Sequence, residues 1–104
     1  MISRVWRGWA SPAHADEYER LLVSTILPGI ASRGIAGYRG AYLYRRADGA
    51  SVEFMTTMMF DSIEAVIGFA GADYEIAVVP EVARRLLERF DARSAHYEVV
   101  LARG

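Results

Sequence analysis

Two histidines, His14 and His96, are the side chains in this sequence best suited to acid–base chemistry near neutral pH. His96 stands two residues before Glu98 in a segment typical of a β-strand, so both side chains are expected on one face. Such a His-x-Glu pair can bind a metal ion, or act as a general base with a carboxylate that orients it. The alternative is a histidine that is only hydrogen-bonded at the margin of a sheet. His14 falls in the first turn of an amphipathic helix, where a solvent-facing or capping position is expected.

Other patterns that carry known chemistry are missing. No third metal ligand stands at a recognisable spacing from His96 and Glu98, so we expect no metal site. The sequence has no cysteine, which excludes disulfides and thiolate catalysis. It also has no Ser-His-Asp spacing, nucleophile elbow, Walker loop or Rossmann glycine pattern.

Length and composition indicate one globular domain spanning residues 1–104. The sequence is 53% hydrophobic and 24% charged, which is typical of a folded chain. A net charge of −1 gives no reason to expect nucleic acid or an anionic membrane as partner. No apolar run approaches the roughly 20 residues of a membrane span. The N-terminal residues do not resemble a signal peptide, so we expect a cytoplasmic protein.

The central part of the sequence predicts a β-hairpin that runs directly into a helix. Strands are expected over residues 38–46 and 51–60, joined by a two-residue turn at Asp48-Gly49. Asp61 is expected to cap the following helix, with Glu64 completing a capping box. Gly71 is expected to end that helix.

The flanking segments complete an alternating order of strands and helices. Residues 2–9 and 93–101 are expected to form strands. Ser11-Pro12 opens a helix that Pro28-Gly29 should kink or end. A third helical segment is expected from Pro80, with Val82, Leu86 and Phe90 on one face. The order β-α-β-β-α-(α)-β predicts a ferredoxin-like α+β fold with a four-stranded antiparallel sheet.

Both faces of the predicted hairpin are apolar, although helices can cover only one of them. One face carries Thr56, Met58 and Phe60 with other apolar residues. The second face is rich in tyrosine and methionine, residue types that are enriched at protein interfaces: Tyr38, Tyr42, Tyr44, Met55 and Met59. An exposed aromatic patch is one interpretation, but patches of that size are unusual on monomers. We therefore expect a homodimer formed through this face.

Two stretches and the C-terminal segment resemble the antibiotic biosynthesis monooxygenase family of dimeric α+β barrels. They are Gly37-Tyr38-Arg39-Gly40-Ala41-Tyr42 and Phe60-Asp61-Ser62-Ile63-Glu64-Ala65, while His96-Tyr97-Glu98-Val99-Val100 is similar to a less characterised branch. The resemblance implies a ferredoxin-like protomer, a homodimer with facing sheets, and a pocket between each sheet and its helices. It implies no cofactor in members that oxidise phenolic polycyclic compounds to quinones.

Other members of that family degrade haem, and this sequence departs from them at three places. Those members have a tryptophan where Phe60 stands, and an asparagine on the first strand where Trp6 stands. They also have a histidine about one helix length after the tryptophan, whereas this sequence has none between His14 and His96. The departures indicate that haem degradation is not the activity.

The resemblance therefore implies a cofactor-independent monooxygenase that acts on a small aromatic or polyketide-like substrate. The expected pocket walls are Trp6, Thr56, Met58, Phe60 and Phe69, and His96 is the candidate base. A tyrosine acting as hydrogen-bond donor is an alternative to His96. Two other functions remain open, a non-catalytic homodimer that binds a small ligand and a polyketide cyclase or isomerase on the same kind of barrel.

Overall fold

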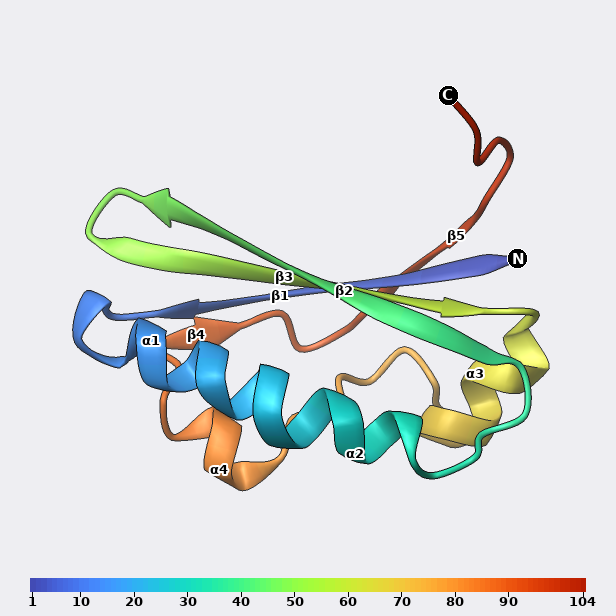
Figure 1. Ribbon diagram of the computed structural model, residues 1–104, viewed down its shortest axis with the longest axis horizontal. Helices are drawn as coiled ribbons and strands as arrows, with labels where there is room; N and C mark the ends of the chain where they lie inside the picture. The colour runs from blue at the N-terminus through green and yellow to red at the C-terminus, as the bar shows by residue number, and fades with distance from the viewer.

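Five antiparallel strands form one sheet, and all the helices lie against one of its faces (Figure 1). The computed structural model describes residues 1–104 in full. The sheet order is β2-β3-β1-β4, with β5 also paired to β1. The strand bounds are β1 (Ile2–Ala10), β2 (Tyr38–Asp48), β3 (Ser51–Phe60), β4 (Arg89–Phe90) and β5 (Ala95–Glu98). The predicted ferredoxin-like α+β fold is confirmed.

The position of the fourth strand is divided between β4 and β5. Strand β4 pairs with Gly8 and Trp9, whereas β5 pairs with the other end of β1, from Ile2 to Val5. Asp91 still bonds to Arg7 on β1, but residues 92–94 leave this strand and bond instead to residues 75–77, through a bridge between Ile76 and Arg93 and two further backbone bonds. The predicted strand over residues 93–101 is therefore shorter.

The first helix is longer than predicted and contains a π-helical turn. Ser11 is the N-cap and Pro12 the first helical residue, as predicted. Segment α1 (Pro12–Leu21) continues into η1 (Leu22–Ile26) and α2 (Leu27–Ala31). Of the two outcomes expected at Pro28, a kink or an end, the end is therefore wrong, and the helix is instead distorted by the π turn just before the proline. Pro28 has no N–H to donate to the preceding turn, and the wider π turn just before it relieves the clash of its ring with the backbone.

The hairpin turn lies one residue later than predicted, at Gly49-Ala50, because Asp48 pairs with Ser51. Gly49 has φ 60°, and all residues with positive φ in the chain are glycines. A turn of this kind requires positive φ only at its first central residue, which here is the glycine. The register moves by two residues, so most side chains keep the predicted face.

A β-bulge near the start of β2 changes the side on which Tyr38 lies. Between Tyr38 and Ala41 the register shifts, and Tyr38 pairs with Phe60. Their rings meet edge to face with centroids 5.6 Å apart. Tyr38 therefore packs under the sheet, and its predicted position on the outer face is wrong.

The helix after the hairpin, α3 (Ile63–Ala70), begins one residue later than expected. Its N-cap is Ser62, whose Oγ accepts a hydrogen bond from the Ala65 N–H at 3.2 Å. The predicted cap Asp61 instead accepts two hydrogen bonds from Arg39, at 2.8 and 2.6 Å. This pair holds the pKa of the Asp61 carboxyl below its ordinary value, chiefly through the side-chain hydrogen bond. Gly71 ends the helix as predicted, with φ 91°.

The third helix, α4 (Glu81–Arg84), is a single turn after Pro80. The expected common helical face of Val82, Leu86 and Phe90 is not formed, because the helix ends at Arg84, and Val82 is 54% exposed whereas Ala83 is buried. Phe90 lies on β4, since the chain rejoins the sheet through a bond from the Glu88 N–H to the Trp9 carbonyl. No helix of the structure combines the length and apolarity needed to cross a membrane.

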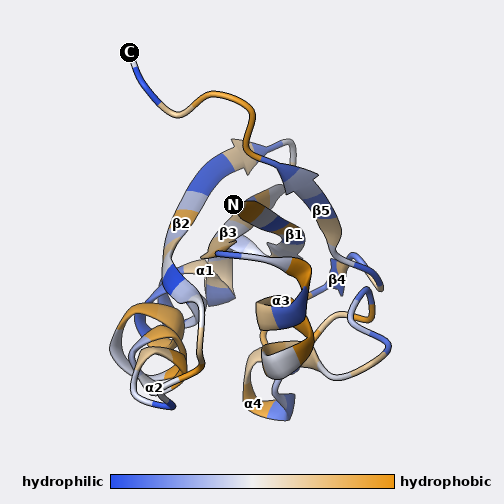
Figure 2. Cartoon of the chain, turned by 90° about the vertical axis from the view of Figure 1, so that its right-hand side faces the viewer, coloured by the Kyte–Doolittle hydropathy of each residue, from blue (hydrophilic) through white to orange (hydrophobic).

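Two apolar clusters fill the space between the sheet and the helices. The first joins α1, β3 and α4, and consists of Ala10, Ala15, Tyr18, Leu22, Phe54 and Ala83. The second lies under α3 and consists of Met58, Phe60, Ala65, Val66 and Phe69. Figure 2 shows the sheet arching over the two groups of helices, with α2 on one side and α3 and α4 on the other. This arrangement leaves room between the clusters.

Candidate functional site

A cavity of about 60 Å³ lies between the sheet and the helices, where the two apolar clusters meet. Four of the predicted pocket residues line it: Trp6, Thr56, Met58 and Phe69. Phe60 does not line it. Its side chain is fully buried behind Phe69, with ring centroids 5.8 Å apart, so it supports the wall and does not form it.

The inner cavity continues to the surface through a groove of about 270 Å³ between α2 and the segment before α4. The cavity and the groove share the lining residues Ile26, Ile30, Phe69, Val78 and Pro80. The π-helical turn η1 contributes Leu22 and Ile26 to the cavity wall. Such turns occur frequently at functional sites. Together the two spaces approach the size range of small-molecule sites.

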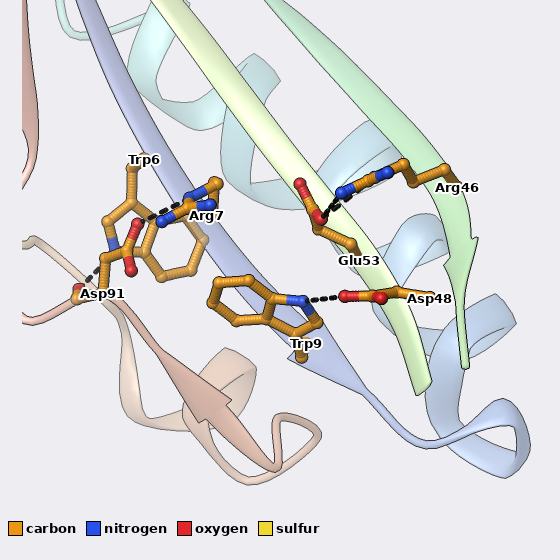
Figure 3. A network of polar contacts seen from close by, with 7 residues as sticks. All are labelled: Trp6, Arg7, Trp9, Arg46, Asp48, Glu53 and Asp91. Carbon is orange, nitrogen blue, oxygen red and sulfur yellow. Dashed lines mark hydrogen bonds and ion pairs between the residues drawn. The ribbon is translucent and has the colours of Figure 1, made fainter. Parts of the chain in front are cut away.

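Trp6 is held in the cavity wall by its neighbours on the sheet. Its indole N–H donates to the Asp91 carbonyl at 2.8 Å (Figure 3). Gly8 lies two residues further along the same face, and a Cβ there would come within 2.8 Å of the Trp6 ring. Glycine at this position therefore leaves the space that the indole occupies.

Arg4 is a site residue that sequence reasoning missed. It lies on β1 two residues before Trp6 and lines the cavity, although its side chain is only 3% exposed. Its Nη1 donates to the Tyr74 carbonyl and, at 2.9 Å, to Nε2 of His96, while Nη2 donates to the Ile76 carbonyl at 3.1 Å. Burial lowers the pKa of Arg4. The alternation of Ile2, Arg4, Trp6 and Gly8 along the strand contained the signal that would have found it.

His96 lies beside the cavity and not in its lining. Its Nε2 accepts the hydrogen bond from Arg4, and its ring packs against the Tyr74 ring in a T-shaped arrangement with centroids 5.1 Å apart. Burial lowers the pKa of His96, the charge of Arg4 lowers it further, and Glu75 acts in the opposite direction. The lone pair of neutral His96 is therefore directed to Arg4. Its predicted partner Glu98 lies on the same face but is exposed, and Arg4 takes the orienting position.

The remaining polar groups of the lining are Tyr18, Thr56 and Ser94, all buried. Burial raises the pKa of Tyr18 well above its ordinary value, so this phenol remains protonated and has a hydrogen to donate. His14 is exposed on α1 and lies outside the cavity. No group of three or more His, Asp or Glu side chains is arranged to hold a metal ion. The cavity thus offers one cation and several hydroxyl groups among apolar walls.

The outer face of the sheet is apolar at one end and polar at the other. The predicted interface residues Tyr42 and Tyr44 are 61% and 47% exposed, and their rings stack with centroids 6.2 Å apart. Met55 and Met59 are half-buried on the central strand β3. The polar end carries the pairs Arg7–Asp91, Arg46–Glu53 and Trp9–Asp48 (Figure 3).

Comparison with solved structures supports the fold. Over 99% of this chain and 98% of the other, the structure superposes on Rv0793 from Mycobacterium tuberculosis with a TM-score of 0.60 and 18% identity. It also superposes on the heme-degrader MhuD (Rv3592) from Mycobacterium tuberculosis, solved with two hemes bound in its active site. That match covers 100% of both chains, with a TM-score of 0.60 and 19% identity. No family model and no curated protein matches the sequence. These likenesses show the ferredoxin-like α+β fold.

The cavity does not suit haem. No histidine is among its lining residues, and His96 uses its Nε2 to accept a hydrogen bond from Arg4. No haem chemistry is proposed for this chain.

Proposed function

We propose that this protein binds a small aromatic molecule in the cavity beneath the sheet and oxidises it with molecular oxygen, as a cofactor-independent monooxygenase. The observation that carries the proposal is an apolar cavity, open to the surface, in which a few polar groups converge. Sites for small organic molecules have this composition. Trp6 and Phe69 supply aromatic walls against which a flat ring can pack.

The proposed reaction needs an electron-rich, deprotonated substrate in a water-excluding site. For a phenol such as 1-naphthol the balance is one substrate and one O₂ giving 1,4-naphthoquinone and water. One oxygen atom enters the ring carbon opposite the hydroxyl, and the other leaves as water with the two hydrogens removed. Oxygen is the oxidant, so no redox group of the protein takes part.

A second function, non-catalytic binding of the same kind of ligand, is favoured by one observation. The cavity lining has no histidine, aspartate or glutamate, so no side chain there is suited to take a proton from the substrate. Catalysis would thus be limited to substrates that ionise readily once bound. A cyclase or isomerase needs an acid or base in the site, and this lining offers no such base.

We further propose that the functional form is a homodimer in which the apolar end of the outer sheet face meets its counterpart. Tyr42 and Tyr44 are largely exposed, and Met55 lies beside them on the paired strand. Contiguous exposed apolar surface of this kind is unusual on a monomer. Tyr38 takes no part in this surface because it packs under the sheet.

Incubation with 1-naphthol in air, in buffer that contains a chelator, tests the proposed function. We expect matching consumption of oxygen and formation of naphthoquinone, and saturable binding measured by calorimetry. Ala83→Val fills the cavity, since Ala83 is buried in its wall, and should abolish both. The matched control Ala92→Val, in an exposed loop, should change neither. Binding without oxidation would support the non-catalytic function, whereas no binding would refute both.

A further inference from the structure

Arg4 is a buried cation without an anionic partner. The seven ion pairs of the structure involve other arginines, and none includes Arg4. Its hydrogen-bond partners are two carbonyl oxygens and the neutral ring of His96, and its guanidinium also lies 5.6 Å from the centre of the Phe69 ring. Burying a charge costs several kcal/mol unless an opposite charge or a full set of hydrogen bonds compensates it. Most buried charges in proteins are paired, so this one stands out.

The guanidinium of Arg4 also has donors to spare. A guanidinium carries five N–H groups, and the recorded hydrogen bonds of Arg4 come from Nη1 and Nη2 alone. Every side-chain nitrogen that is fully enclosed in the protein has a hydrogen-bond partner. The Nε–H of Arg4 thus has no acceptor within the protein and is not enclosed, and the residue lines the cavity.

The surroundings of the cavity reinforce the positive charge. Tyr18, Thr56 and Ser94 contribute hydroxyl groups, and the lining contains no carboxylate. Glu75, the acid whose charge acts on His96, is exposed and forms an ion pair with Arg93 at 3.3 Å. Arg33 stands at the surface mouth, with its guanidinium 5.4 Å from the centre of the Phe69 ring. Charge in a water-poor cavity acts more strongly than charge at the surface.

From this arrangement we infer that the cavity selects an organic anion, a phenolate or carboxylate attached to an aromatic ring, and that Arg4 holds its charged oxygen. The inference rests on the proposed function, because it names the class of ligand that the cavity takes. A planar guanidinium matches a charged oxygen with directed N–H groups. It also supplies what the lining lacks, since stabilising the phenolate favours its ionisation without a base in the site.

His96 is a positioning residue in this arrangement. As a neutral ring it accepts a hydrogen bond from Nη1, at 2.9 Å, and so restrains the plane of the guanidinium. The carbonyls of Tyr74 and Ile76 hold the other edge. A carboxylate in place of His96 would neutralise the site, whereas a neutral acceptor leaves the positive charge for the ligand.

Binding of 4-nitrophenol, whose yellow phenolate is visible by absorbance, tests the inference beside uncharged nitrobenzene. In the wild-type protein we expect the pKa of the bound phenol to fall by about one unit, a tenfold preference for the anion. Arg4→Gln should remove that shift and weaken phenolate binding about tenfold, while nitrobenzene binds as before. Arg33→Gln removes a charge at the mouth, outside the lining of the inner cavity, so it should retain most of the shift.

Each outcome of this experiment decides between the two proposals. Binding of nitrobenzene without preference for the phenolate in the wild-type protein would overturn the inference and leave the proposed function standing. Failure of both probes to bind would overturn both. Loss of the phenolate preference in Arg33→Gln and not in Arg4→Gln would assign anion binding to the mouth and refute the role of Arg4. If Arg4→Gln does not fold, Arg4→Lys keeps the charge and should retain part of the shift.

Discussion

Replacing Gly37 by alanine should separate α3 from the start of β2 and thereby disturb the cavity wall. Gly37 has φ 83°, a region that residues with a Cβ rarely adopt. A Cβ at this position would lie 2.6 Å from the Cβ of Ala65 on α3. The Gly37 carbonyl also accepts the Asp61 N–H at 2.8 Å, just before α3 begins. Helix α3 carries Phe69, which lines the cavity.

The expected loss of stability has two parts. Positive φ at an alanine costs about 1–2 kcal/mol. The contact with Ala65 forces side chains or backbone to move, and such overpacking costs about 1–3 kcal/mol. The free energy of unfolding of Gly37→Ala should therefore fall by about 2–5 kcal/mol, less a few tenths for the stiffer unfolded chain. That is a large part of the stability of a small domain.

Urea unfolding followed by circular dichroism measures this change, and Gly34→Ala is its matched control. Gly34 has φ 65° but has nothing within 4 Å of a Cβ, so this variant should lose only the backbone part. In the double variant Gly37→Ala with Ala65→Gly the contact is relieved, and about 1–3 kcal/mol should return beyond the sum of the single changes. Equal losses in Gly37→Ala and Gly34→Ala, with no recovery in the double variant, would refute the reasoning.

Three further predictions concern pH, assembly and helix capping. Burial and the charge of Arg4 lower the pKa of His96 below its ordinary 6.5, so the unfolded chain takes up this proton more readily than the folded one. Stability should therefore be greatest above pH 6.5 and fall as the pH drops through the pKa of His96 in the folded protein. His96→Gln should remove this pH dependence from the urea midpoints, whereas the control His14→Gln should retain it. Met55→Arg on the outer face should shift the mass in light scattering from dimer to monomer with unchanged circular dichroism, and a wild-type monomer would contradict the homodimer. Ser62→Ala should lower the free energy of unfolding by about 1 kcal/mol, since it removes the cap bond to α3, and no change would mean that the cap is not formed.

Local rules of the chain predicted the order of elements and several of their ends. Ser11-Pro12 begins the first helix and Gly71 ends α3, as expected from caps that act within a few residues. The faces of the hairpin followed from alternation with period two, and they survived an error in the turn because the register moved by two residues. Trp6, Thr56 and Met58 line the cavity because of the same alternation along their strands, whereas Phe69 reaches it from helix α3.

Misplaced residues were those whose environment depends on distant parts of the chain. Tyr38 turned inward because a bulge next to it breaks the alternation and its ring packs on Phe60. Phe90 lies on a strand because the edge of β1 was available to pair with it. The helix passed Pro28 because a π turn absorbed the proline. Each of these depends on a fit between elements that local spacing does not encode.

The candidate site shows this division most clearly. By itself the sequence determined that a histidine would stand on the last strand and that apolar side chains would line one face of the sheet. Only the tertiary structure decided that Arg4 is buried against the Tyr74 carbonyl and His96, groups 70 and 92 residues away along the chain. An arginine on a strand is exposed or buried according to what packs over its face of the sheet. Here residues 74–76 and β5 surround Arg4. The charge of the cavity is therefore a property of the fold.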